Sequence, residues 1–198
     1  MKNDLTIVIP SHNRHRYFER FLTYYSDFDC DILIVDSTIT AFEFKSKSVN
    51  IFYEHLPEKT FTGKLSFAFN KIKTKFVVLC ADDDFLIKDG LKDCIAFLNE
   101  NTSYSVALGN NIYYKKETIK KGFVDFYLMY YDRFFYDISI NDPMNRLSVC
   151  FENYRTIFSA VQYTENLRLA FQDAEIPVKN LFLNEYLIVI CPKIVLNK

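Results

Sequence analysis

The alternation of strand-like and helical segments over residues 5–108 is the feature that most constrains the fold. Short apolar runs rich in β-branched residues are typical of buried strands, and such runs occur at 5–9, 31–35, 49–53, 76–80 and 104–108. Between them, apolar residues recur with the spacing of an amphipathic helix, as at Leu65, Ala68 and Phe69. Strands separated by helices imply right-handed crossovers, so this half predicts an α/β fold built on a mostly parallel sheet.

The second half of the chain has less regular patterns. Aromatic residues crowd 123–136 without clean periodicity, whereas Asp142-Pro143 is a typical helix start. The sequence further predicts a strand at 157–163 and, after it, a helix that Thr164 caps. Since no repeat, low-complexity stretch or Pro/Gly-rich linker divides the chain, we expect a single domain over residues 1–198.

Glycine is scarce, and this excludes two classes of phosphate-binding protein. The chain has 4 glycines in 198 residues, and no two are close enough to form a Gly-rich phosphate loop. Both the P-loop and the usual dinucleotide-binding motif are therefore absent. If the protein binds a diphosphate, a bound cation must neutralise the negative charge of the phosphates. Backbone N–H groups of a Gly-rich loop do so in the two excluded classes.

Charge and cysteine content bound the partners and the compartment. The net charge of −1 gives no global attraction to nucleic acid or anionic lipid, so we expect no nucleic-acid partner and at most peripheral membrane association. The 5 cysteines are odd in number and lack C-x-x-C spacing, which favours free thiols. Without a signal peptide or a long apolar run, the chain is expected to be cytoplasmic.

Polar residues follow three of the predicted strands, at 10–14, 36–38 and 82–84. Ligands of open parallel sheets bind at the carboxyl ends of the strands, so these residues are the candidates for a site. In an extended segment Asp82 and Asp84 point to the same side and can share one Mg²⁺ or Mn²⁺ ion. The alternative is a solvated acidic turn that precedes a helix.

Three motifs together resemble the N-terminal half of family 2 glycosyltransferases. They are Leu5–Arg14 (LTIVIPSHNR), Ile34–Ser37 (IVDS) and Val78–Phe85 (VLCADDDF). In that family the first strand ends in Pro-Thr/Ser-x-Asn-Arg, the second in Val-Asp, and a later one in a D-x-D metal motif. The resemblance covers about residues 4–110 and implies the nucleotide-sugar-binding GT-A fold, a Rossmann-like sheet flanked by helices.

The resemblance implies roles for the first two motifs. Pro10, Ser11 and Asn13 would shape the nucleotide pocket, with Arg14 nearby. Asp36 would accept a hydrogen bond from the nucleobase.

The resemblance leaves the metal residue open. Asp83 would contact ribose or sugar hydroxyls, and either Asp82 or Asp84 would hold Mn²⁺ or Mg²⁺ on the diphosphate. The common family motif is Asp-Ala/Ser-Asp-Asp, and alignment to it puts Cys80 on its first position and Asp82 on the usual metal position. A bare D-x-D pattern favours Asp84 instead, and we favour that residue.

A helix of the family that carries Gly-x-x-x-Ala-Arg-Asn corresponds here to residues 63–70 (GKLSFAFN). Phe69 stands at the arginine position, so the cation of the family is missing. Lys64 can supply a charge instead, because a lysine near a helix N-terminus is unfavourable unless an anion binds there. The alternative is a solvated surface lysine.

Inverting members of the family also need a carboxylate that deprotonates the acceptor hydroxyl. The best match is Glu185, which apolar residues flank on both sides, so that desolvation would raise its pKa. Asp173 and Glu175 are the alternatives. The aromatic residues at 123–136 are either an acceptor platform or, as we favour, a packed flap or oligomer contact.

These features favour a metal-dependent, inverting glycosyltransferase. The enzyme would move a sugar from a nucleotide-diphosphate donor to a glycan, a lipid-linked or another hydroxyl acceptor in surface polysaccharide synthesis. Residues about 1–110 would bind the donor and about 111–198 the acceptor, in a possible homodimer or larger multidomain parent. The alternative hypothesis is a non-catalytic nucleotide- or glycan-binding module. A sugar-1-phosphate nucleotidyltransferase is disfavoured because its Gly-rich N-terminal loop is missing.

Overall fold

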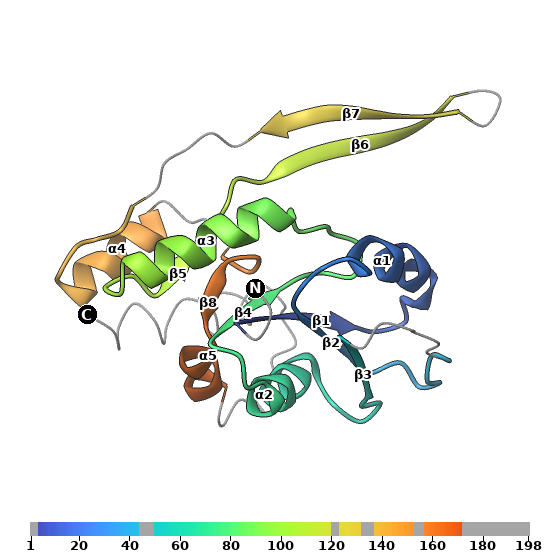
Figure 1. The fold of residues 1–198 in the computed structure, drawn as a ribbon, viewed down its shortest axis with the longest axis horizontal. Helices are drawn as coiled ribbons and strands as arrows, with labels where there is room; N and C mark the ends of the chain where they lie inside the picture. Colours follow the sequence, from blue (N-terminus) through green and yellow to red (C-terminus); the bar gives the residue numbers. More distant parts are fainter. Residues whose placement is uncertain (1–3, 44–49, 120–122, 132–136, 153–156, 172–198) are drawn as a thin grey trace.

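The computed structural model describes residues 4–43, 50–119, 123–131, 137–152 and 157–171, and these form three layers with a sheet in the middle (Figure 1). The strands of the main sheet are β1 (Leu5–Ser11), β2 (Asp31–Asp36), β3 (Ile51–His55), β4 (Phe76–Leu79), β5 (Val106–Ala107) and β8 (Val161–Tyr163). The helices are η1 (His15–Tyr17), α1 (Phe18–Tyr25), α2 (Phe61–Lys71), α3 (Lys88–Glu100), α4 (Pro143–Glu152) and α5 (Thr164–Ala170). A separate hairpin pairs β6 (Ile112–Ile119) with β7 (Phe123–Tyr131).

The main sheet has the strand order β3-β2-β1-β4-β8-β5. Its first four strands are parallel, whereas β8 runs antiparallel to both β4 and β5. The predicted α/β fold with a mostly parallel sheet is therefore confirmed. Because β8 comes from the second half of the sequence and lies between two strands of the first half, both halves contribute to one sheet.

Helices cover both faces of the sheet, and each face has its own apolar core. On one face, α1 and α3 contribute Phe18, Tyr25, Leu91 and other buried residues. On the other face, α2 and α5 pack against Val8, Leu79 and their neighbours. The apolar stripe predicted on α2 is buried, which confirms the helical spacing.

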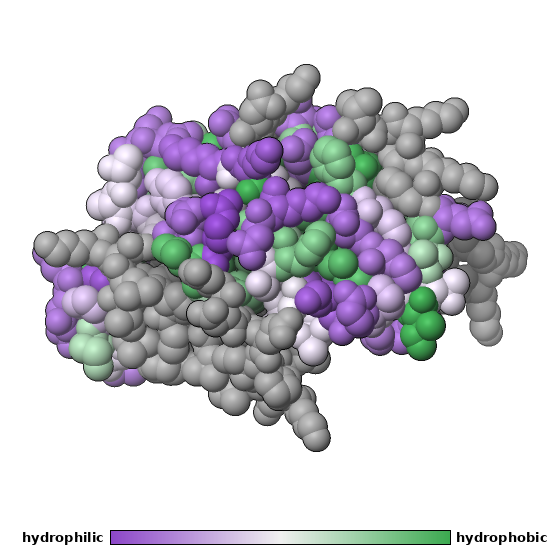
Figure 2. Space-filling model, turned by 90° about the horizontal axis from the view of Figure 1, so that it is seen from below, coloured by the Kyte–Doolittle hydropathy of each residue, from purple (hydrophilic) through white to green (hydrophobic). Residues whose placement is uncertain are grey.

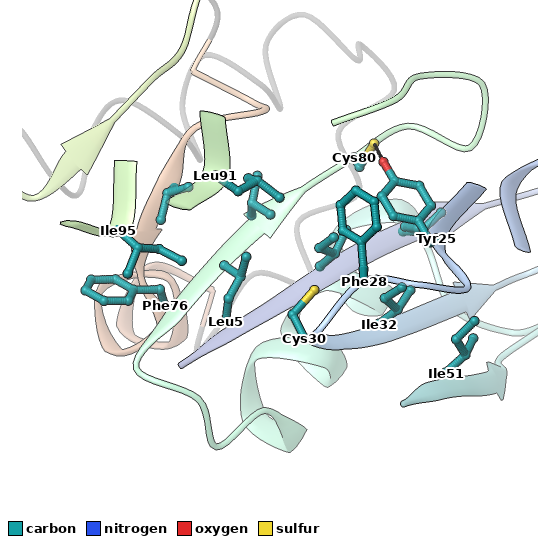
Figure 3. Close-up of a cluster of buried hydrophobic side chains, with 14 of the residues drawn as sticks. Leu5, Tyr25, Phe28, Cys30, Ile32, Ile51, Phe76, Cys80, Leu91 and Ile95 are labelled. Atoms are coloured by element: carbon teal, nitrogen blue, oxygen red, sulfur yellow. Dashed lines mark hydrogen bonds between the residues drawn. The ribbon is translucent and has the colours of Figure 1, made fainter. Parts of the chain in front are cut away.

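The first core also holds a thiol–hydroxyl contact near the end of β4. The Tyr25 hydroxyl lies 3.4 Å from the Cys80 sulfur, and both side chains point into the cluster of Figure 3. Burial raises the pKa of the Cys80 thiol to about 12, so the sulfur is neutral at physiological pH. Cys80 is a core residue.

Pro10 lies inside β1, although the predicted strand ends at residue 9. The strand continues to Ser11, which pairs with Asp36 of β2. The Val8 carbonyl accepts a hydrogen bond from Cys80 N–H at 2.9 Å, and beyond Val8 strand β1 no longer pairs with β4. Residues 8 and 10 of a strand direct their backbone groups to the same side, so the backbone nitrogen of Pro10 faces the side where β4 has ended. A missing N–H there removes no hydrogen bond of the sheet.

Two predictions for residues 157–164 differ from the structure. The strand expected at 157–163 forms only at β8, because Ala160 N–H donates to the Ile157 carbonyl and closes a turn. Thr164 does not cap α5: Tyr163 occupies the N-cap position, and the buried Thr164 hydroxyl has no hydrogen-bond partner among the described residues. The predicted cap of α4 is confirmed, since Asp142 Oδ2 accepts from Asn145 N–H at 2.8 Å.

The face that carries α2 and α5 is mainly hydrophilic where its residues are described (Figure 2). Its apolar areas are small and separated, as is usual for a protein surface. The longest helix in the described ranges, α3, has 13 residues, which is too few to span a membrane.

Candidate functional site

The loop after β1 is held against the end of β2 by hydrogen bonds. Ser37 N–H donates to the Ser11 carbonyl at 3.1 Å, and Asn13 N–H donates to Thr38 Oγ1 at 2.8 Å. Asn13 has a φ of 57°, in the left-handed region that asparagine tolerates better than most residues. The loop therefore turns sharply at Asn13 and brings Arg14 back over the strand ends.

The acidic residues after β4 form a turn and not an extended segment. Asp84 N–H donates to the Ala81 carbonyl at 3.2 Å, which closes a turn through Asp82 and Asp83. Asp82 is buried, whereas Asp83 and Asp84 are exposed. The expectation that Asp82 and Asp84 share a side of an extended strand is wrong, because the chain turns before Asp84.

Asp82 is committed to two partners within the protein. Its Oδ2 accepts a hydrogen bond of 2.7 Å from Ser11 Oγ, and its Oδ1 lies 2.6 Å from Arg14 Nε. Arg14 also forms an ion pair with Asp83. Burial raises the pKa of Asp82, and the contacts with Ser11 and Arg14 offset that rise only in part. Asp82 thus fastens the turn after β4 to the loop after β1.

Asp84 has the free carboxylate of the acidic turn. The side chain of Asp84 forms no hydrogen bond or ion pair with any residue that the structure describes. Its pKa is raised, first by partial desolvation and then by the negative charge of Asp83. Across the described ranges no group of three or more His, Cys, Asp or Glu side chains could hold a metal ion. A cation at Asp84 would therefore need ligands beyond the His, Cys, Asp and Glu side chains of those ranges.

Asp36 is buried at the end of β2, and both of its carboxylate oxygens are occupied. Oδ1 accepts from Thr38 N–H at 2.9 Å and from Thr38 Oγ1 at 2.6 Å. Oδ2 accepts from His15 Nε2 at 2.6 Å and from the Tyr53 hydroxyl at 2.8 Å. Burial opposes ionisation of Asp36, but these hydrogen bonds outweigh it and lower its pKa. The carboxylate that we expected to meet a nucleobase is thus occupied by protein groups.

Lys64 lies in the first turn of α2, and its side chain reaches the end of β1. Its side chain is buried, with 3 % of the residue exposed, so the alternative of a solvated surface lysine is wrong. The ammonium donates to the Ser11 carbonyl. Burial lowers the pKa of Lys64 to about 8, while the carboxylates of Asp36 and Asp82 act in the opposite direction. Lys64 therefore places a positive charge beneath the ends of β1, β2 and β4.

Two departures from the family motifs are explained by packing. Phe69, at the position of the family arginine, is fully buried and packs edge to face on Phe171, with ring centroids 5.0 Å apart. Cys80, at the position of the first motif aspartate, lies in the core against Tyr25. Neither residue faces the site, so these two positions contribute no charge to it.

Sequence reasoning found only part of the site and missed two partners of Asp36. Thr38 belongs to the predicted polar segment 36–38, but His15 and Tyr53 carried no motif, and only the fold brings them to this carboxylate. The candidate bases Glu185 and Asp173, like Glu175, lie outside the described residues. The same holds for the end of the aromatic segment, at 132–136.

The chain is similar to proteins of known structure. S. aureus TarS 1–349 in complex with UDP-GlcNAc is similar, with a TM-score of 0.51 at 16% identity, over 83% of this chain and 46% of that one. A 2-C-methyl-D-erythritol 4-phosphate cytidylyltransferase from Thermus thermophilus aligns with a TM-score of 0.46 at 13% identity, over 84% of this chain and 73% of that one. No curated protein sequence matches the chain.

The chain thus spans less than half of the TarS chain that it matches, and at such identity the likeness concerns the fold alone. A family comparison reaches further, because it rests on the sequence itself. The family described as Glycosyl transferase family 2 matches residues 6–160. That range holds nearly all of the three strand-end motifs and most of the chain, and so the protein belongs to glycosyl transferase family 2.

Proposed function

We propose that this chain binds a nucleotide-diphosphate sugar and a divalent cation and transfers the sugar to a hydroxyl acceptor. The observation that carries the proposal is the free carboxylate of Asp84, which follows the buried Asp82 at the carboxyl ends of the parallel strands, where Asp36 and Asp82 act on the charge of the buried Lys64. Ligands of such sheets bind at this edge. Family membership supports the same reaction class.

Asp84 suits a hard cation better than Asp82 does. Mg²⁺ and Mn²⁺ are bound through carboxylate oxygens together with substrate phosphates. The oxygens of Asp82 already meet Ser11 and Arg14, whereas those of Asp84 are free among the described residues. We therefore assign the metal to Asp84, and ribose or sugar hydroxyls to the carboxylate oxygen of Asp83 that does not pair with Arg14. When bound, the cation neutralises charge on the departing diphosphate.

The remaining groups of this chain have separate tasks. Lys64 contributes a fixed positive charge from below the strand ends. Pro10, Ser11 and Asn13 shape the loop over which the nucleotide lies. In the inverting reaction, Glu185 takes the proton of the acceptor hydroxyl. The acceptor oxygen then bonds to the anomeric carbon as the bond between that carbon and the diphosphate breaks. Asp173 is the second candidate for this base.

The donor can be identified by thermal unfolding with nucleotides in the presence and absence of Mn²⁺. TarS was solved with UDP-GlcNAc, so UDP is the first nucleotide to test, followed by GDP, CMP and TDP. A ligand present at about 100 times its dissociation constant stabilises the native state by roughly 2.7 kcal/mol. We expect one nucleotide to raise the melting temperature only when Mn²⁺ is present.

Matched variants separate metal binding from catalysis. Asp84→Asn should abolish the Mn²⁺-dependent shift, whereas Asp93→Asn, which removes an exposed carboxylate from α3, should keep it. Hydrolysis of the donor sugar should disappear in Glu185→Gln. A shift of equal size in Asp84→Asn would overturn the metal assignment. Nucleotide binding without any turnover would favour the non-catalytic module instead.

A further inference from the structure

Three arginine side chains surround one tyrosine ring where η1 passes into α1. The guanidinium carbons of Arg14, Arg16 and Arg20 lie 4.5, 4.8 and 5.1 Å from the centroid of the Tyr17 ring. Arg20 also lies over the Phe85 ring, at 5.0 Å. Contacts with aromatic faces hold the guanidinium groups in place without neutralising them.

Of the three, Arg14 has its charge balanced by carboxylates of the protein. It pairs with Asp82 and Asp83. Arg16 and Arg20 are exposed, and within the described ranges neither forms an ion pair with a carboxylate. Arg16 donates to the Tyr17 hydroxyl at 2.8 Å, and Arg20 donates to the Asp83 carbonyl at 3.4 Å.

The spacing of Arg16 and Arg20 is unfavourable without an anion. Like charges four residues apart on a helical face destabilise it by a few tenths of a kcal/mol. Glu19, the acidic residue in the first turn of α1, forms no ion pair with either arginine among the described residues. The nearby charge of Asp84 acts on Arg20 without an ion pair. An external anion would therefore stabilise this arrangement.

We propose that Arg16, Tyr17 and Arg20, here called the arginine platform, bind a phosphate ester group of the acceptor. Guanidinium forks bind phosphate oxygens in pairs, which makes phosphate a preferred partner of clustered arginines. The contact of Arg20 with Asp83 places the platform next to the acidic turn, at the rim of the donor site. The acceptor assignment rests on the proposed glycosyl transfer, whereas phosphate binding itself does not.

Calorimetric titration with glycerol 3-phosphate tests the proposal on the full chain, with glycerol as the uncharged probe. The variant R16Q/R20Q should bind glycerol 3-phosphate at least tenfold more weakly. The variant K73Q/K92Q removes two exposed positive charges elsewhere and should bind it as the unchanged protein does. Arg16→Lys and Arg20→Lys keep the charge but lose the paired hydrogen bonds, so each should give intermediate affinity even if the double variant folds poorly.

Each outcome bears on the assignment. Binding of glycerol 3-phosphate together with UDP and Mn²⁺ supports a separate acceptor site, whereas competition with UDP would overturn it and place the arginines in the donor site. Binding of phosphatidylglycerol vesicles without binding of glycerol 3-phosphate would indicate that a lipid carries the phosphate. Equal affinities in R16Q/R20Q and K73Q/K92Q would refute the platform. Absence of any nucleotide binding in the unchanged protein would instead refute the proposed function.

Discussion

The three adjacent aspartates after β4 differ in what the protein does with them. Asp82 is tied to Ser11 and Arg14, while Asp84 is exposed and free among the described residues. Removing a partner from a buried hydrogen-bonded group costs about 1–3 kcal/mol, whereas an exposed substitution costs within about 0.5 kcal/mol. The two carboxylates therefore contribute unequally to stability.

We expect Asp82→Asn to lower the free energy of unfolding by about 1–2 kcal/mol, since it removes the ion pair with Arg14 but can keep the Ser11 bond. Asp84→Asn should leave that free energy within about 0.5 kcal/mol of the original. Urea denaturation of both variants measures the difference. Equal losses would contradict the division of roles.

The environment of Asp36 illustrates what a motif predicts at the residue scale. Its position at the end of β2 followed from the Val-Asp motif, and the structure confirms that position. Its partners His15 and Tyr53 belong to other segments, and their contacts arise only when β1, β2 and β3 pair. Local sequence patterns carry no information on such distant hydrogen bonds, so they could not be predicted.

At the scale of elements, α2 joins the core to the site. One side of this helix buries Phe69, and its first turns carry Lys64. We expect Phe69→Arg, which restores the residue of the family, to lower the free energy of unfolding by more than about 3 kcal/mol, because it buries an unpaired charge against Phe171. Phe69→Leu keeps this core position apolar and should lower the free energy of unfolding by roughly 1.5 kcal/mol. Thermal unfolding of both variants is the measurement, and tolerance of the arginine would show that the helix can turn toward the site.

The N-cap of α2 is a second test at this scale. Thr60 Oγ1 accepts from Gly63 N–H at 3.1 Å, one turn before the buried ammonium of Lys64. Thr60→Ala removes this acceptor and should cost about 1 kcal/mol, while Thr60→Ser should be nearly neutral. Urea unfolding compares the two. If Thr60→Ala also weakens nucleotide binding and Thr60→Ser does not, the cap positions Lys64 as well as the helix.

Elements with a periodic sequence were predicted well, and local exceptions were not. The stripe on α2 repeats over several turns, and burial confirms it. The sequence of the turn at Asp82 and Asp83 is equally compatible with a continued strand. Only the hydrogen bond from Asp84 N–H to the Ala81 carbonyl distinguishes the turn. Pro10 would end a strand paired on both sides, but β4 has already ended beside it. Strand β7 belongs to a separate hairpin and does not pair with the main sheet. Its sequence has no regular alternation of apolar and polar residues, so the strand was not predicted.

At the scale of the whole molecule, the buried Lys64 makes stability depend on pH. Its pKa is about 8 in the folded protein, against 10.5 for the ordinary side chain. Below pH 8 both states are protonated, and the folded state bears the cost of a buried charge. Between pH 8 and 10.5 the unfolded state binds more protons, so stability should rise with pH by up to about 3 kcal/mol from this group.

The measurement is the difference in unfolding free energy between the original protein and Lys64→Met at pH 7.5 and at pH 10. The variant removes the titrating group, so titration of other side chains cancels in the difference. We expect the free energy of unfolding of the original protein to rise relative to that of Lys64→Met as pH rises. A difference that is constant over this range would mean that Lys64 keeps its ordinary pKa.

The arrangement of the sheet was only partly accessible from the sequence. The parallel pairing of β1 to β4 was predicted from the alternation of strands and helices, whereas their order, β3-β2-β1-β4, was not. The insertion of β8 between β4 and β5 depends on pairing between segments far apart in the chain, such as Val77 with Gln162. No local pattern encodes that pairing, although the apolar residues of β8 predicted a buried strand.

All 3 histidines of the chain contact the segment that follows β2 or the last residue of that strand. His12 lies 3.0 Å from Ser37, His15 bonds to Asp36, and His55 Nε2 lies 2.7 Å from the Thr38 carbonyl. A nuclear magnetic resonance spectrum of the imidazole nitrogens would therefore contain three rings, each reporting on the same few residues. Such a spectrum would follow occupancy of the strand ends directly, without enzyme assays or assignment of the backbone.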